Sequence, residues 1–294
     1  MAGLAAGIEF GGTKCLGVVL DETGKVLRSY RRPTPRHADD LMRTVLDVAT
    51  ALEPWDTLGL GAGGLVDIDG VLRFAPNVGR INLFPLGERI SERLGRFVPI
   101  DNDGTLAAVA EWHFGVGVGI DDMVLLTLGT GIGCGIVAGG KLQRGANGLA
   151  GEPGHMVIDP SGPMCVCGQR GCWERFASGS GLTYLSGGRR GEDVNAAARR
   201  GEADAVDVFD RFAWWLALGI VNLVNFIDPG LIVIGGGLVE AHDLYLGATR
   251  QYVQELRYAS ASRPPVRIEA AKLGEQAGAI GAALIGVERA VPIS

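Results

Sequence analysis

Apolar and polar positions along the chain predict strands that alternate with helices. Short apolar runs bounded by Gly, Asp or Asn are typical of buried strands. We expect such strands at residues 4–10, 15–20, 26–31, 57–62, 97–100, 123–128, 134–138, 231–234 and 266–270. Apolar residues at helical spacing predict helices at 38–52, 86–94, 105–114, 178–186, 194–200, 203–227, 238–256 and 275–288. This alternation indicates an α/β protein.

The first glycine cluster, Gly11-Gly12-Thr13-Lys14, lies between two predicted strands. We therefore expect an antiparallel meander, whereas a Rossmann fingerprint or a P-loop needs a helix directly after its glycines. Glycines at a hairpin tip let backbone N–H groups approach phosphate oxygens, and Thr13 adds a hydroxyl. A plain hairpin turn fits this motif equally well.

Two later glycine clusters extend the pattern. Gly129-Thr130-Gly131 again joins two predicted strands, so the chain contains two similar strand–turn–strand units that could hold a polyphosphate between them. Gly235-Gly236-Gly237 lies where a strand is followed by a helix. Its backbone could face the adenine and ribose of a nucleotide, or it could simply be the loop that leads into the helix.

A polar cluster, Asp101-Asn102-Asp103-Gly104, follows the strand predicted at 97–100 and precedes a helix. The carboxyl end of a strand is a favoured place for catalytic groups in α/β sheets. On this motif alone, Asp103 also fits the N-cap of the helix.

The stretch from residue 152 to 174 contains His155, Cys165, Cys167 and Cys172. Three thiolates and one imidazole fill the tetrahedral shell of a structural Zn²⁺. Disulfides are disfavoured because the total of 5 cysteines is odd and two of these thiols are one residue apart. The remaining alternative is a set of unligated, small apolar cysteines. A metal here would hold the flanking Glu152 and Glu174 rigidly, beside a small polar ligand.

Composition narrows the function classes. The chain has 294 residues, a net charge of −6 and 47% hydrophobic residues, which is typical of a globular protein. Its pI of about 5.3 disfavours nucleic acid as a partner. No apolar run approaches the ~20 residues that span a membrane, and the first residues do not resemble a secretory leader. We therefore expect a cytoplasmic protein.

Together these stretches resemble the ROK family of repressors, open reading frames and sugar kinases, and within it the bacterial glucokinases. The most specific part is Glu152-Pro-Gly-His155 with Cys165-x-Cys167-Gly-x-x-Gly-Cys172-x-Glu174, which is similar to the family's zinc signature. The resemblance implies an actin-like ATPase (ribonuclease H-like) fold with an interlobe cleft between two α/β lobes. We expect a smaller lobe at 1–113 plus about 284–294, and a larger lobe with the zinc loop at 114–283.

The resemblance also implies roles for individual residues. Asp103 is the expected catalytic base and, with Asn102, binds the sugar. The other implied sugar contacts are Gly64, Asn77, Glu152, His155 and Glu174. The implied contacts to ATP and Mg²⁺ are Glu9, Gly11, Gly12, Thr13, Lys14, Gly129, Thr130, Gly131, Gly235, Gly236 and Gly237. Glu9 stands where most members have Asp, and Asp101 where Glu is common; we expect no consequence from the second change.

The resemblance implies transfer of the ATP γ-phosphoryl group to the 6-hydroxyl of glucose, by a homodimer or a tetramer. Alternatives are kinases for mannose, fructose, N-acetylglucosamine or N-acetylmannosamine, and a non-catalytic sugar-sensing protein. A sugar-responsive repressor needs a DNA-binding module ahead of the fold, and only six residues precede Gly7. The sequence leaves open whether polyphosphate can replace ATP.

Overall fold

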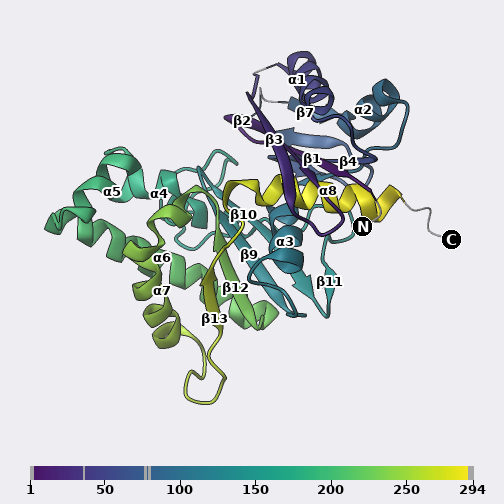
Figure 1. Cartoon of the computed structure of the whole chain (residues 1–294). Helices are drawn as coiled ribbons and strands as arrows, with labels where there is room; N and C mark the ends of the chain where they lie inside the picture. The colour runs from purple at the N-terminus through teal and green to yellow at the C-terminus, as the bar shows by residue number, and fades with distance from the viewer. Residues whose placement is uncertain (1–2, 36, 76–77, 79–80, 291–294) are drawn as a thin grey trace. The chain divides into compact units, whose positions relative to one another are not determined.

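The computed structural model describes residues 3–35, 37–75, 78 and 81–290, which group by their contacts into two compact units (Figure 1). Unit 1 takes in residues 1–118, 142–151 and 275–294, and unit 2 takes in 119–141 and 152–274. The two lobes expected from the sequence stay a prediction. By contacts, residues 142–151 and 275–283 group with the N-terminal part of the chain.

The helices and main-sheet strands of unit 1 follow the predicted alternation, while the three short strands β5, β6 and β7 were not predicted. They are β1 (Ala5–Phe10), β2 (Lys14–Leu20), β3 (Val26–Pro33), α1 (Ala38–Ala51), β4 (Thr57–Ala62), β5 (Leu65–Val66), β6 (Leu72–Ala75), β7 (Ile81–Phe84), α2 (Leu86–Leu94), β8 (Ile100–Asn102), α3 (Asp103–Phe114) and α8 (Ala277–Ala290).

Unit 2 contains the remaining elements, with β11 (Lys141–Leu142) at its boundary. They are β9 (Met123–Leu128), β10 (Ile132–Ala138), α4 (Gly179–Leu185), α5 (Gly191–Arg199), α6 (Ala203–Ile227), β12 (Leu231–Gly235), α7 (His242–Leu256) and β13 (Arg267–Ala270). Short 3-10 helices occur at Pro153–His155, Trp173–Arg175, Gly237–Ala241 and Gly274–Gln276.

The main sheets of the two units have the same topology. In unit 1 the strand order is β3-β2-β1-β4-β8, with β1–β2 and β2–β3 antiparallel, and β1–β4 and β4–β8 parallel. In unit 2 the order is β11-β10-β9-β12-β13, with β9–β10 antiparallel, and β9–β12 and β12–β13 parallel. The predicted meander and the predicted similarity of the two glycine-turn units are therefore both confirmed.

Opposite faces of the unit 1 sheet are covered differently. Because side chains alternate along a strand, Ile8 faces the apolar cluster that includes α1, while Gly7 faces α8. A Cβ at Gly7 would lie 2.0 Å from Ala279 O, and one at Gly59 would lie 2.0 Å from Ala282 O. The backbone of α8 therefore packs directly against β1 and β4, as Figure 1 allows the reader to follow.

Two predicted elements begin later than expected, and the helix predicted at 194–200 begins earlier, at Gly191. The strand predicted at 97–100 is formed by residues 100–102, because Val98 N is bonded to Ser91 Oγ of α2 and the Phe97 side chain is 66% exposed. The helix predicted at 238–256 begins at His242, after a 3-10 turn. The first shift depends on a contact with α2 that a local pattern does not contain.

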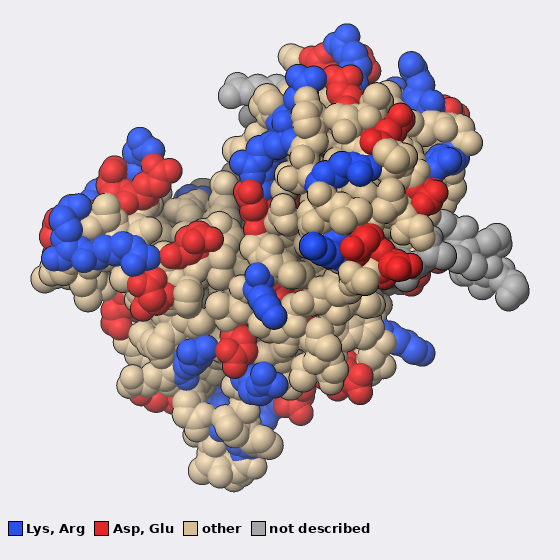
Figure 2. Space-filling view, in the orientation of Figure 1, with Lys and Arg blue, Asp and Glu red and all other residues tan. Residues whose placement is uncertain are grey.

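The charges on the described surface (Figure 2) and the lengths of the described helices are consistent with the globular protein that the composition predicts. Figure 2 shows acidic and basic side chains interspersed over the visible face. Among the helices in the described part of the chain, none combines the length and the apolar content needed to cross a membrane.

Candidate functional site

Three loops of unit 1 meet at one edge of its sheet. Strands β1, β4 and β8 are parallel, so the residues that follow them lie at the same edge. These are the Gly11–Lys14 turn, Gly63-Gly64 and Asp103. A Cβ at Gly63 would lie 3.3 Å from both Asp103 Oδ2 and Gly11 Cα. The structure therefore brings the predicted base close to the first glycine turn.

The pair Asn102–Asp103 is held by hydrogen bonds at the start of α3. Asn102 is the N-cap, since its Oδ1 accepts a bond from Thr105 N at 3.0 Å; the alternative in which Asp103 is the N-cap is therefore wrong. Asn102 Nδ2 also donates to Gly64 O at 2.9 Å. Asp103 Oδ1 accepts from Gly104 N at 2.9 Å. Burial raises the pKa of Asp103 to about 6, so its carboxylate is a stronger base than an ordinary aspartate.

Glu9 is a second buried carboxyl group in unit 1. Burial, with the nearby Asp103 charge as a smaller cause, raises the pKa of Glu9 to about 7. A Cβ at Gly278 would lie 2.7 Å from Glu9 Cδ, so the glycine in the first turn of α8 leaves room for the longer side chain. Glutamate at this position is thus accommodated by a specific glycine.

The first glycine turn is closed by a backbone hydrogen bond, and the ammonium group of its Lys14 is bonded to Glu275. Gly11 N donates to Lys14 O at 3.0 Å, and the space that a Cβ at Gly11 would take is open. Lys14 Nζ donates to Glu275 Oε2 at 3.1 Å and to Glu275 O at 3.2 Å. Glu275 also pairs with Arg31. The sequence offered no signal for Glu275, because it lies 261 residues away along the chain.

The two glycine motifs of unit 2 lie at one edge of the second sheet. Gly235 pairs with Thr127, next to the Gly129–Gly131 turn, and the Gly236 backbone (φ 80°) lies close to Leu128. The turn is bonded to the start of α4, because Gly129 O accepts from Gly179 N at 2.8 Å and Thr130 O from Ser178 Oγ at 3.0 Å. The structure thus places both predicted nucleotide motifs of this unit together.

The predicted metal ligands form a cluster in unit 2. The donor atoms of His155, Cys165, Cys167 and Cys172 all lie within 4.8 Å of one another. Cys167 Sγ is 3.6 Å from Cys172 Sγ, and Cys165 Sγ is 3.7 Å from His155 Nδ1. Zn–S bonds of ~2.3 Å and Zn–N bonds of ~2.0 Å give tetrahedral edges of about 3.5–3.8 Å. These two distances match such edges, so the donor set is compatible with a four-coordinate zinc ion.

A buried tryptophan fixes this loop to the core of unit 2. Trp173 is fully buried and its Nε1 donates to Trp215 O of α6 at 2.9 Å. A Cβ at Gly219 would lie 1.9 Å from the Trp173 ring, so only glycine fits on α6 at this point. Trp215 stacks on Phe176 with ring centroids 4.1 Å apart. The aromatic residues of α6 are core, as expected, and they also support the metal loop.

Glu174 lies between the metal cluster and the second glycine turn. Cys165 Sγ donates to Glu174 Oε1 at 3.0 Å, and His155 Nδ1 lies 3.9 Å from the same oxygen. Glu174 Oε2 would be 2.3 Å from a Cβ at Gly131. The His155 side chain is 38% exposed, and because Nδ1 faces the thiols, Nε2 remains available to a ligand.

Some predicted residues are less well defined. Asn77 lies outside the described residues. Gly64 adopts φ 140° against the Phe74 backbone, which explains glycine there. Glu152 precedes the short helix that carries His155, and its carbonyl accepts from His155 N at 3.1 Å. Asp101, expected to be of no consequence, is buried and paired with Arg144, which the sequence did not single out.

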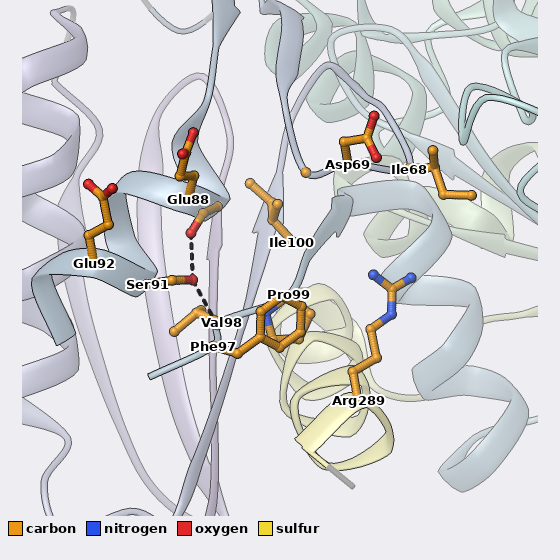
Figure 3. Close-up of a pocket in the computed structure, with 12 residues that line it drawn as sticks. Ile68, Asp69, Glu88, Ser91, Glu92, Phe97, Val98, Pro99, Ile100 and Arg289 are labelled. Carbon is orange, nitrogen blue, oxygen red and sulfur yellow. Dashed lines mark hydrogen bonds between the residues drawn. The ribbon is translucent and has the colours of Figure 1, made fainter. Parts of the chain in front are cut away.

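A separate pocket of about 430 Å³ lies in unit 1 (Figure 3). It is lined by Ile68, Asp69, Gly70, Gly87, Glu88, Ser91, Glu92, Phe97, Val98, Pro99, Ile100 and Arg289. None of these is a predicted sugar- or nucleotide-binding residue. The lining contains carboxylates and the exposed Phe97 but none of the glycine turns described above, so we do not assign a phosphate-containing ligand to this pocket.

Comparison with known proteins identifies the family. The ROK family model matches residues 5–289. The chain is 34% identical to a glucokinase of Streptomyces coelicolor over 96% of each chain. It is also 34% identical to an N-acetyl-D-glucosamine kinase of Pectobacterium atrosepticum over 95% of this chain and 97% of that protein.

A solved structure gives the same result at the level of the fold. A ROK family glucokinase from Streptomyces griseus, crystallised with glucose and AMPPNP, is 34% identical. It superposes with a TM-score of 0.90 and covers 97% of this chain and 100% of that one. The fold is the actin-like ATPase fold of the ROK kinases, and the chain belongs to the ROK family.

Proposed function

We propose that this protein is an ATP-dependent glucokinase that phosphorylates the 6-hydroxyl of glucose. The observation that carries the proposal is the buried Asp103, with a pKa raised to about 6, beside Gly63 and the Gly11 turn. A carboxylate poised near neutral pH beside backbone suited to phosphate is what transfer to an alcohol requires. The similarity to glucokinases supports glucose as the acceptor.

Asp103 acts as the general base. Its carboxylate accepts the proton of the 6-hydroxyl as that oxygen forms a bond to the γ-phosphorus and the bond to the ADP leaving oxygen breaks. Asn102 keeps the start of α3 in place through its bonds to Thr105 N and Gly64 O, and so orients Asp103. Base catalysis of this kind typically contributes ~10²–10⁴-fold.

Each unit contains residues that we propose as contacts for sugar hydroxyls. Gly64 and Asn102 contribute from unit 1, together with Asn77. Glu152, His155 and Glu174 contribute from unit 2. Zinc, when bound to His155, Cys165, Cys167 and Cys172, supplies rigidity to this loop. His155 Nε2 and the Glu174 carboxylate can then accept or donate hydrogen bonds without first being ordered.

The nucleotide is bound by backbone groups of the glycine motifs. Gly11, Gly12 and Thr13 of unit 1 and Gly129–Gly131 of unit 2 contact the phosphates, and Gly235–Gly237 contact the adenosine. Mg²⁺, when bound with ATP, neutralises phosphate charge, and Glu9 lies in the part of unit 1 suited to its coordination shell. Lys14 reaches the phosphates by exchanging its bond to Glu275.

A coupled assay of ADP release over five sugars tests the proposal. Glucose, mannose, fructose, N-acetylglucosamine and N-acetylmannosamine are compared with ATP, and again with polyphosphate. The expected result is the highest kcat/KM with glucose and ATP. A higher value with N-acetylglucosamine favours the second candidate, an N-acetylhexosamine kinase, which the equal identity to such a kinase supports. No sugar-dependent ADP release from folded, metal-loaded protein leaves a non-catalytic sugar sensor.

The assembly and compartment complete the proposal. A homodimer, or a tetramer built from it, in the cytoplasm fits a ROK kinase. A reducing compartment keeps Cys165, Cys167 and Cys172 as zinc ligands rather than disulfides.

A further inference from the structure

A buried ion pair lies directly before the proposed catalytic base. Arg144 Nε donates to Asp101 Oδ2 at 2.6 Å, and the two side chains are 22% and 6% exposed. Burial lowers the pKa of Arg289 in α8, and the nearby Arg144 guanidinium lowers it further, while Asp101 opposes this effect. Arg289 therefore also lies near this ion pair.

Asp101 acts on the backbone that carries the site. Its second oxygen, Oδ1, accepts a bond from Asn102 N at 2.9 Å. That peptide leads directly to the Asn102 side chain, which caps α3 and binds Gly64 O, and to Asp103. If the Asp101 carboxylate moves, this hydrogen bond moves the peptide that carries Asn102 and Asp103, the two proposed sugar-binding residues.

Arg144 is itself held by its own segment, residues 142–151. Ala150 N donates to Arg144 O at 3.1 Å, which closes the segment into a loop. Ile68 N donates to Asn147 O at 3.1 Å, and a Cβ at Gly148 (φ 80°) would lie 2.6 Å from Ile68 N. The loop is thus attached to unit 1, and the next residue along the chain is Glu152, a proposed sugar contact of unit 2.

We propose that Arg144 is a positioning residue, which acts through Asp101 to hold Asn102 and Asp103 in the geometry for phosphoryl transfer. The proposal rests on the function proposed above. The ion pair joins the loop at 142–151, through Arg144, to the strand end that carries Asp103, through Asp101. Because a misplacement of about 1 Å can cost about 10²-fold in rate, loss of this pair is expected to affect catalysis more than folding.

Substitutions at Arg144 test this, with Arg73 as the matched control. Arg73 Nε binds Asp67 Oδ2 at the same 2.6 Å, and the Asp67 side chain is 4% exposed, but this pair makes no bond to Asn102 or Asp103. Per folded molecule, Arg144→Gln should lower kcat for glucose at least tenfold and raise KM for glucose, with KM for ATP unchanged. Arg144→Lys should recover part of kcat, since an ammonium can still donate to Asp101.

The controls separate positioning from stability. Arg73→Gln should lower the denaturation midpoint and leave kcat within twofold of the parent protein. Asp101→Asn combined with Arg144→Gln should be no slower than the slower single variant, because both remove one interaction. Equal kcat and equal KM for glucose in Arg144→Gln and Arg73→Gln, corrected for folded fraction, would overturn the proposal.

Hydrogen exchange gives a readout that does not depend on activity. In Arg144→Gln, the amides of Asn102 and Thr105 should exchange faster than in Arg73→Gln. If the parent protein phosphorylates no sugar, the proposed function fails. The difference in exchange would still support the conclusion that Arg144 holds Asn102 in place through Asp101. Equal exchange rates in the two variants would contradict this positioning role of Arg144, whatever activity is measured.

Discussion

At the scale of single residues, the acid–base behaviour of unit 1 depends on two buried carboxyl groups. Burial raises the pKa of Asp103 to about 6 and that of Glu9 to about 7. Both values lie within the range in which an enzyme operates. The two groups therefore link the protonation state of the site both to its rate and to the stability of the fold.

Replacement of the proposed base should lower the rate without disturbing the shape. Asp103→Asn keeps the bond from Gly104 N but cannot accept a proton, so kcat for glucose should fall by ~10²–10⁴-fold. In the parent protein, kcat/KM should fall as the pH decreases through about 6, where Asp103 becomes protonated. Steady-state rates between pH 5 and 9 measure both effects. An undiminished rate in the variant contradicts the assignment.

The same carboxyl groups should make stability depend on pH. Their pKa values are higher in the folded protein than the ordinary values of 3.8 and 4.5, so the folded state binds protons more tightly. Stability is therefore greatest at low pH with respect to these groups and decreases as the pH rises through about 4 to 7. Glu9→Gln and Asp103→Asn should each stabilise the fold at pH 8 by on the order of 2–3 kcal/mol.

Urea unfolding at pH 8 and pH 4.5 checks the sign. The gain should be much smaller at pH 4.5, where both parent carboxyls are already protonated in the folded state. A gain of the same size at both pH values would show that packing, rather than charge, is responsible.

At the scale of elements, glycines decide how closely α8 packs on the unit 1 sheet. Gly59→Ala places a methyl group about 2.0 Å from Ala282 O, so β4 and α8 must separate. We expect a loss of about 3 kcal/mol or more in the free energy of unfolding. Gly247→Ala, at an exposed position of α7, is the control because the added Cβ meets nothing within 4 Å. This change should be neutral or raise the free energy of unfolding by about 0.5–1 kcal/mol. Equal effects on the unfolding midpoint would contradict the close packing.

The metal loop should depend on all of its thiols. Cys167→Ala should abolish bound zinc, lower the melting temperature and raise KM for glucose, because Glu174 and His155 would lose their support. Cys15→Ala, which changes a buried cysteine of β2 outside the cluster, should keep one zinc per chain. Metal analysis and kinetics on both variants measure this. Full zinc content in Cys167→Ala would remove Cys167 from the ligand set.

At the scale of the whole molecule, the two units repeat one topology. Each has an antiparallel pair with a glycine turn, followed by two parallel strands. Each unit contains its own set of the proposed ligand contacts. Unit 1 provides Asp103 and one glycine turn, while unit 2 provides the metal loop and the other glycine motifs.

Ligand binding should therefore protect both units. With glucose and a non-hydrolysable ATP analogue, amide exchange should slow at Asn102–Thr105 in unit 1 and at Gly129–Gly131 in unit 2. Glucose at ~100 times its Kd should also raise the free energy of unfolding by about 2.7 kcal/mol. Exchange that slows in one unit only would contradict the proposed division of contacts, and the Asp103→Asn variant is the control for binding without turnover.

The local pattern was sufficient for much of the fold. Glycine clusters between apolar runs predicted both hairpins, and the helix predicted at 203–227 has the same bounds as α6. The metal ligands could be identified because they are close in sequence and their donor chemistry is specific. The start of β8 could not be predicted, since Ser91 Oγ of α2 binds Val98 N from another element.

By itself, the sequence determined the class of elements and the His and Cys residues of the candidate metal cluster, because each depends on residue type and short spacing. The resemblance to the family, rather than the motif alone, indicated Asp103 as the candidate base. Tertiary structure alone decided which groups meet: Glu275 with Lys14, Gly278 with Glu9, and Arg144 with Asp101. It also decided the protonation of Asp103 and Glu9, because burial and neighbouring charge exist only when distant segments pack together. Pairings between residues far apart in the chain leave no periodic signal in it.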